Sequence, residues 1–228
     1  MVLGDGRQAR LRSTDTPVTE VVARLAGIAS PVDLIVPGGL TSADAIAALT
    51  QTALGDDESM GPTLIQTKPR NPAIFQSLTE PAWVAVFPGA PHRSRLSLAA
   101  GLLQVHDFWD ASHDAAQRAD DLGEREFSAY WHGIAHRREP DAGNAAYWFR
   151  RVGKHQNFKS LAEEARPLLD HHGDQALSAR LISGGAWNPS AMIDLCTSAK
   201  PGSPSEAIAR RLQRIEMWLL LEATFAAV

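Results

Sequence analysis

The chain has 228 residues, of which 44% are hydrophobic and 21% are charged, and its formal net charge is −4. This length can bury a sizeable core, and the composition is ordinary for a globular soluble protein. The negative net charge disfavours non-specific binding to nucleic acid and to anionic membranes.

The apolar stretches and the cysteine usage indicate where the protein resides. The opening stretch MVLGDGRQARLRSTDT contains basic residues but lacks the apolar run of a secretory signal. No stretch reaches the roughly 18 apolar residues that a membrane span needs. The single cysteine, Cys196, can form no intrachain disulfide, which fits a reducing compartment. We therefore expect a cytoplasmic protein with a flexible N-terminus at residues 1–15 and one helical domain at residues 16–228.

Four helix starts are marked by a capping side chain followed by proline, a pair that suits the first turn of a helix. These pairs begin at Thr16, Asn71, Asn188 and Ser203. After Ser203, Glu206 completes a capping-box pattern, and the apolar residues that follow recur at helical spacing. The patterns predict helices from residues 17, 72, 189 and 204 onward.

Further helices are predicted over residues 95–120, 124–139, 144–152, 160–172 and 174–183, with Pro167 expected to kink or split the fourth of these. Between residues 31 and 94, the short apolar runs 33–36, 63–67 and 83–87 are compatible with strands, extended segments or short buried helices. The chain is therefore predicted to be mainly α, with an irregular N-terminal third in which short strands remain an option.

Histidines recur at helical spacing on two of the predicted helices. His106, Asp110 and His113 share one face of the helix over residues 95–120, and His132 and His136 share one face of the next helix. A short connection allows the two helices to pack antiparallel, which would bring both histidine stripes together. These five residues are the candidate ligands of a metal site.

Two chemical roles and one structural role remain open for these histidines. Imidazole and carboxylate groups suit a first-row transition metal, whereas His132 and His136 are also candidates for a catalytic general base near neutral pH. Gly133 occupies the position where zinc metalloproteases carry glutamate, so that hydrolytic motif is excluded. Alternatively, the histidines form a hydrogen-bonded packing network between helices. Whether the protein is an enzyme is left open.

Arginines and aromatic residues gather next to the second histidine pair. Arg137, Arg138 and Arg150 could hold an anionic small-molecule ligand, with Tyr147 and Trp148 as the wall of the pocket. Ion pairs that anchor the turn between two helices explain the same arginines equally well. An alternative function is an interaction module that docks a protein or a single-stranded nucleic acid, although the net charge disfavours nucleic acid.

The segment WHGIAHRREPDAGNAAYWFRR resembles a motif of a group of uncharacterised bacterial proteins. In that group, Tyr-Trp-His-Gly-Ile-x-His-Arg-Arg-Glu-Pro-Asp leads into Asn-x-x-Tyr-Trp-Phe-Arg-Arg. The likeness covers residues from about 105 to 155, and it implies no activity, cofactor or partner.

Overall fold

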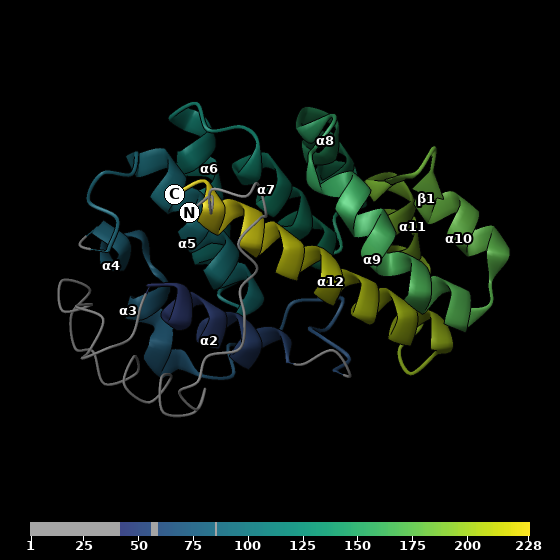
Figure 1. Cartoon of the computed structure of the whole chain (residues 1–228). Coiled ribbons are helices and arrows are strands. Elements are labelled where there is room, and N and C mark those ends of the chain that lie inside the picture. Colours follow the sequence, from purple (N-terminus) through teal and green to yellow (C-terminus); the bar gives the residue numbers. More distant parts are fainter. Residues whose placement is uncertain (1–41, 56–58, 85) are drawn as a thin grey trace.

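The computed structural model describes residues 42–55, 59–84 and 86–228, and Figure 1 draws the other residues as a thin grey trace. The predicted flexible N-terminus, the helix predicted from residue 17 and the apolar run 33–36 lie outside the described residues.

Within the described ranges the chain forms eleven α-helices, one short 3₁₀ helix and a single two-stranded sheet, which confirms the mainly α prediction. In chain order the helices are α2 (Ser42–Leu54), the 3₁₀ helix η2 (Pro72–Ile74), α3 (Phe75–Leu78), α4 (Glu80–Val84), α5 (His92–Val105), α6 (Trp109–Asp121), α7 (Phe127–Arg138), α8 (Ala142–Val152), α9 (Asn157–His172), α10 (Gln175–Leu181), α11 (Pro189–Ser198) and α12 (Pro204–Ala226). The strands β1 (Ile182–Ser183) and β2 (Ala186–Trp187) pair antiparallel around Gly184 and Gly185. These glycines have φ values of 60° and 79°, which suit a tight hairpin turn.

The helix starts predicted at Asn188 and Ser203 are confirmed. Asn188 Oδ1 accepts hydrogen bonds from two backbone N–H groups in the first turn of α11. Ser203 Oγ accepts a hydrogen bond from the N–H of Glu206 at 3.2 Å, in the first turn of α12. These caps satisfy N–H groups that have no partner inside the helix. Asn71 instead precedes the 3₁₀ helix η2 and makes no side-chain cap.

Helix α12 lies at the centre of the molecule and packs against α2, α5, α9 and α11 (Figure 1, yellow). Gly101 of α5 allows two other helices to come close at this centre. A Cβ atom at this position would lie 2.7 Å from the ring of Trp131 in α7 and 2.9 Å from Cδ2 of Leu221 in α12. The core therefore depends on the absence of a side chain at Gly101.

The single helix predicted over residues 95–120 is wrong, because α5 ends at Val105 and α6 begins at Trp109. Asp107 lies between the two helices with a left-handed φ of 66°. Its carboxylate accepts hydrogen bonds from Arg138 Nη2 at 2.5 Å and from Thr67 Oγ1 at 3.1 Å. Breaking a buried ion pair is strongly destabilising, because it leaves an uncompensated charge in the core. The contacts of Asp107 therefore hold the turn between α5 and α6 in place. Residues before and after the break therefore do not share one helix face.

The other predicted elements differ in smaller ways. The helix predicted over residues 160–172 begins earlier, at Asn157, and α9 runs through Pro167 without being split. Run 63–67 forms no strand, and the first two residues of run 83–87, Trp83 and Val84, end α4. The strand option for these two runs is therefore wrong, and the second run begins at the end of a short helix in which Trp83 is buried and Val84 is exposed.

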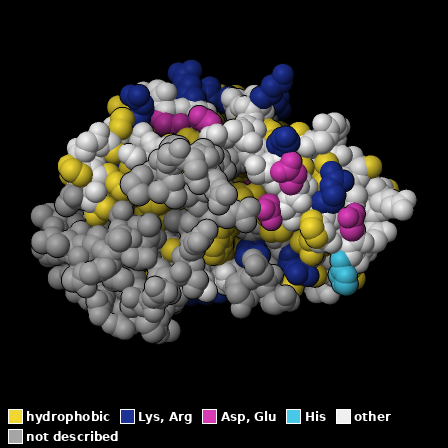
Figure 2. All heavy atoms as spheres, in the orientation of Figure 1, with side chains coloured by type: hydrophobic (Ala, Val, Ile, Leu, Met, Phe, Trp, Pro, Cys, Tyr) yellow, Lys and Arg dark blue, Asp and Glu magenta, His cyan; other side chains and the backbone are white. Residues whose placement is uncertain are grey.

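The surface of the described part of the chain mixes charges of both signs. Figure 2 shows basic and acidic side chains interspersed over the face that Figure 1 presents. None of the described helices has the length and apolarity required to cross a membrane.

Candidate functional site

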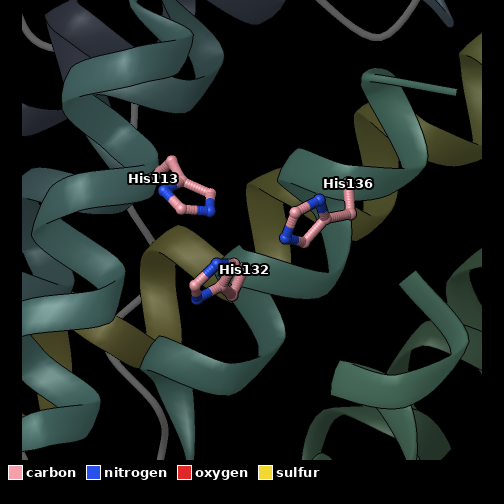
Figure 3. Close-up of side chains that lie close together, drawn as sticks. All are labelled: His113, His132 and His136. Atoms are coloured by element: carbon pink, nitrogen blue, oxygen red, sulfur yellow. The ribbon is translucent and has the colours of Figure 1, made fainter. Parts of the chain in front are cut away.

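Three imidazole rings meet between α6 and α7. His113 comes from α6, whereas His132 and His136 lie one turn apart on α7 (Figure 3). One possible ligand atom from each of the three residues lies within 4.8 Å of the other two. This arrangement brings His113 of the first predicted stripe to His132 and His136 of the second.

The three rings have a definite mutual geometry. The rings of His132 and His136 are stacked, with centroids 5.0 Å apart and 12° between their planes. The ring of His113 is nearly perpendicular to both, at 80° to His132 with centroids 4.3 Å apart and at 88° to His136 with centroids 5.2 Å apart. The imidazole nitrogen atoms of the cluster therefore come from two helices, and the rings that carry them have two different orientations.

Helix α6 is held against α7 by its first residue. Trp109 Nε1 donates a hydrogen bond to the carbonyl oxygen of Ala135 at 2.9 Å. The same indole stacks on the ring of His113 one turn later, with centroids 5.1 Å apart and 27° between the planes. Because it contacts both helices, Trp109 fixes the position of His113 relative to α7. Trp109 was not among the predicted site residues, although its position four residues before His113 places it on the same helix face.

A second indole covers the cluster from the side of α8. Trp148 stacks on His132, with centroids 3.8 Å apart and 13° between the planes. The guanidinium carbon of Arg151 lies 5.0 Å from the Trp148 ring centroid, a distance at which a cation is attracted to the ring face. Arg151 is held there by Asp120 of α6, because its Nη2 donates to both carboxylate oxygens at 2.8 and 2.9 Å.

Burial of the cluster is uneven, which defines its accessible side. His132 and His136 are 1% and 8% exposed, whereas the side chain of His113 is 28% exposed. The cluster is therefore most exposed to solvent at His113, on α6.

The environment favours the neutral form of His132 and of His113. Burial lowers the pKa of His132 to about 3, with further lowering by His113, His136 and Arg151. Burial and the neighbouring His136 also lower the pKa of His113, against the opposing effect of Asp114. Neutral imidazole is the form that binds metal ions, so these two rings can coordinate an ion without first losing a proton.

The Nδ1 atoms of the three histidines differ in their hydrogen-bond partners. His136 Nδ1 lies 2.9 Å from Glu139 Oε2. His113 Nδ1 is 3.9 Å from Asp114 Oδ1, which is too long for a hydrogen bond. His132 Nδ1 is buried and has no hydrogen-bond partner within the described ranges. A buried polar atom without a partner is costly, and a bound ion or water is a common reason for one.

His106 and Asp110, the other two predicted metal ligands, lie apart from the cluster. His106 Nε2 is 2.9 Å from the carbonyl oxygen of Leu49, so this ring connects the end of α5 to α2. Burial lowers the pKa of His106 to about 4. Asp110 is exposed in the first turn of α6 and is not part of the cluster. The break at Asp107 separates His106 from the helix that carries His113, whereas Asp110 shares α6 with His113 but is exposed.

The predicted ligand-binding arginines do not gather on one surface. Arg137 Nη2 donates to Glu216 Oε2 of α12 at 2.5 Å, and both side chains are buried. Arg138 is also buried and pairs with Asp107, whereas Arg150 is exposed on α8. The charges of the first two arginines are therefore neutralised inside the core.

The predicted aromatic wall is divided between two environments. Tyr147 is 46% exposed, whereas Trp148 is buried and contacts His132. Their rings meet edge to face, with centroids 5.4 Å apart. Trp148 thus belongs to the histidine cluster, and Tyr147 lies outside it.

Comparisons of the chain with protein-family models, with curated proteins and with solved structures find no match. The resemblance of the segment from about 105 to 155 remains a prediction, and any function rests on the geometry of the site.

Proposed function

We propose that the protein binds one divalent first-row transition metal ion, Zn²⁺ foremost, through His113, His132 and His136. The observation that carries the proposal is the convergence of three imidazoles with possible ligand atoms within 4.8 Å of one another. The depressed pKa values of His113 and His132 support it, because these imidazoles need not lose a proton before they coordinate.

The donor set fits the chemistry of zinc. Zinc is typically held by three or four protein ligands, and sites with three ligands keep one position open for water or substrate. Zn–N bonds of about 2.0–2.1 Å place tetrahedral nitrogen atoms about 3.4 Å apart. The nitrogen atoms of the cluster, which are within 4.8 Å of one another, would therefore draw closer by side-chain rotation.

The open position would face the accessible side of the cluster, where His113 is partly exposed. A zinc ion with an open position acidifies bound water and polarises carbonyl or phosphoryl oxygens, the chemistry that a hydrolase or lyase would use. The residues of this chain would contribute the ligands, the two indole walls and the exclusion of bulk water on the α8 side. Any catalysis at this site would require the bound metal ion.

Metal titration of untagged protein tests the proposal. The protein is treated with a chelator, dialysed, and titrated with Zn²⁺, Co²⁺ and Cu²⁺ while binding is followed by calorimetry and elemental analysis. We expect one ion per chain and tighter binding of Cu²⁺ than of Co²⁺. Zn²⁺ at about 100 times its Kd should stabilise the fold by about 2.7 kcal/mol.

Single histidine variants locate the ion. His113→Gln and His136→Gln should each weaken binding at least tenfold, whereas His171→Gln, which removes an exposed imidazole of α9 outside the cluster, should bind like the wild type. Circular dichroism establishes that each variant is folded. The proposal fails if the wild type binds no ion, or if the cluster variants bind as tightly as His171→Gln. In that case the three rings serve the packing of α6, α7 and α8.

A second readout comes from the indole walls. Cu²⁺ quenches tryptophan fluorescence at short range, and Trp109 and Trp148 are in ring contact with two of the proposed ligands. We expect quenching that saturates at one Cu²⁺ per chain and that decreases in a Trp109→Phe, Trp148→Phe double variant. Quenching that continues to rise without saturation would indicate loose surface binding instead.

A further inference from the structure

We infer that Glu139 is a positioning residue of this metal site, whose carboxylate holds the Nδ1–H of His136 and thereby makes Nε2 the atom that binds the metal. This inference rests on the proposed function and deepens it, since it names a residue that sets the affinity of the site without touching the ion.

The contact between the two side chains carries the inference. His136 Nδ1 lies 2.9 Å from Glu139 Oε2, and the two residues are three positions apart at the end of α7. A carboxylate accepts hydrogen bonds and does not donate them, so the proton at this contact belongs to the imidazole. A neutral imidazole carries one proton, and the lone pair is then on Nε2.

The backbone and the neighbouring rings keep this pair in place. Glu139 is the residue that caps the C-terminus of α7, and its N–H donates to the carbonyl oxygen of Ala135 at 3.0 Å. The ring of His136 is stacked on His132 and meets the indole of Trp109 edge to face at 6.3 Å. The imidazole is therefore restrained on several sides, and Glu139 selects its tautomer.

Glu139 is distinguished from the other acids near the cluster. Within the described ranges it is the carboxylate that lies at hydrogen-bond distance from one of the three imidazoles, because Asp114 is 3.9 Å from His113. Its negative charge would also offset part of the charge of a divalent ion held by three neutral ligands.

Direct ligation by Glu139 is the competing arrangement. His136, Glu139 and Asp141 also have possible ligand atoms within 4.8 Å of one another. However, both carboxylate oxygens of Asp141 are engaged at the start of α8, since Oδ1 accepts from the N–H of Asn144 at 2.9 Å and Oδ2 from its side-chain amide at 2.7 Å. An ion at that position would compete with this helix cap for the Asp141 carboxylate, so the geometry favours Glu139 in the outer shell of the three-histidine site.

Affinity measurements separate the two arrangements. Removal of an outer-shell partner weakens metal binding by about 10–100-fold. The Glu139 side chain is 38% exposed, so water can take its place beside His136 once the carboxylate is removed. We therefore expect Glu139→Ala to weaken Co²⁺ binding by about tenfold, at the low end of this range. Glu139→Gln, which keeps an acceptor oxygen but loses the charge, should lose less. Asp141→Asn is the matched control and should bind Co²⁺ within twofold of the wild type.

A nuclear magnetic resonance measurement tests the tautomer directly. Long-range ¹H–¹⁵N spectra of the Zn²⁺-loaded protein should show that Nε2 of His136 is metal-bound and that Nδ1 carries the proton. A purely structural role of Glu139 would change the melting temperature of the metal-free protein, but would not specify which nitrogen binds the ion.

The outcomes distinguish this inference from the proposed function. If the wild type binds no Co²⁺, both are overturned. If the wild type binds Co²⁺ but Glu139→Ala binds equally well, or Nδ1 of His136 is the ligand, the role of Glu139 alone is overturned. If Asp141→Asn weakens binding as much as Glu139→Ala while His113→Gln has no effect, the ion lies at the competing position.

Discussion

The indole of Trp148 lies flat against the imidazole of His132, with ring centroids 3.8 Å apart. The stack crosses the interface between α8 and α7, and Gly133, the next residue along α7, lies at the same interface. A Cβ atom at Gly133 would be 2.9 Å from the ring of Phe149, which follows Trp148 in α8. The close approach of the two helices therefore depends on a glycine, and it brings the second indole onto the histidine cluster.

Gly133→Ala should destabilise the protein by up to about 2 kcal/mol. Alanine favours a helix interior by about 1 kcal/mol over glycine, but overpacking against an aromatic ring costs about 1–3 kcal/mol. Gly143→Ala is the control, because its Cβ would meet only Asp141 Oδ1 at an ordinary 3.5 Å. That variant should be as stable as the wild type or slightly more stable. Urea denaturation compares the two, and equal midpoints would contradict the packing argument.

Replacement of Trp148 by alanine should cost about 3–5 kcal/mol of unfolding free energy, as is usual for a large buried aromatic side chain. Trp148→Phe keeps a ring over His132 and should cost less. The neighbouring residue provides the comparison, since Tyr147 is 46% exposed and Tyr147→Ala should cost less than about 1 kcal/mol. A small loss for Trp148→Ala would show that the stack does not hold α8 on α7.

Asp107→Ala should destabilise the protein by about 3–5 kcal/mol, because it leaves the buried guanidinium of Arg138 without its carboxylate partner. The matched control is Asp110→Ala, an exposed acid in the first turn of α6, which should change stability by less than about 0.5 kcal/mol. Thermal and urea unfolding of both variants measure the difference. Similar losses would mean that the ion pair does not define the turn between α5 and α6.

The metal-free protein should lose stability as the pH falls below about 6.5. Burial lowers the pKa of His132 to about 3 and the pKa values of His106 and His155 to about 4, from 6.5. Between these values and 6.5, the unfolded chain binds protons that the folded chain does not, so acid favours unfolding. Each such histidine contributes a slope of up to about 1.4 kcal/mol per pH unit, and the full stabilisation is present above 6.5.

Unfolding free energies from urea titrations between about pH 7 and pH 5 measure this slope. The pKa of His113 is lowered as well, so His106→Gln removes one of four such groups, and its slope should be shallower by up to about a third. His171→Gln, at an exposed position, should keep the slope of the wild type. A wild-type stability that stays constant over this range would contradict the assigned burial effects.

Local sequence signals determined most of the helices and two of the three histidines of the cluster. The caps at Asn188 and Ser203 act within one turn of the chain, so they are readable without the rest of the fold. The same holds for His132 and His136, because a spacing of four places two side chains on one face of any helix. A short link before α7 also favoured antiparallel packing that would bring His106, Asp110 and His113 toward this pair, and of these three only His113 joins the cluster in the structure.

Only the tertiary structure decided which of the predicted site residues lie outside the histidine cluster. The turn at Asp107 depends on Arg138 and Thr67, which are 31 and 40 residues away in the chain, and it separates His106 from His113. Arg137 is drawn into the core by Glu216, 79 residues away. No local pattern encodes such pairings, because a buried charge takes its position from the partner that neutralises it. The sequence by itself determined where helices begin and which side chains share a helix face, whereas long-range ion pairs and ring contacts decided which of those faces meet.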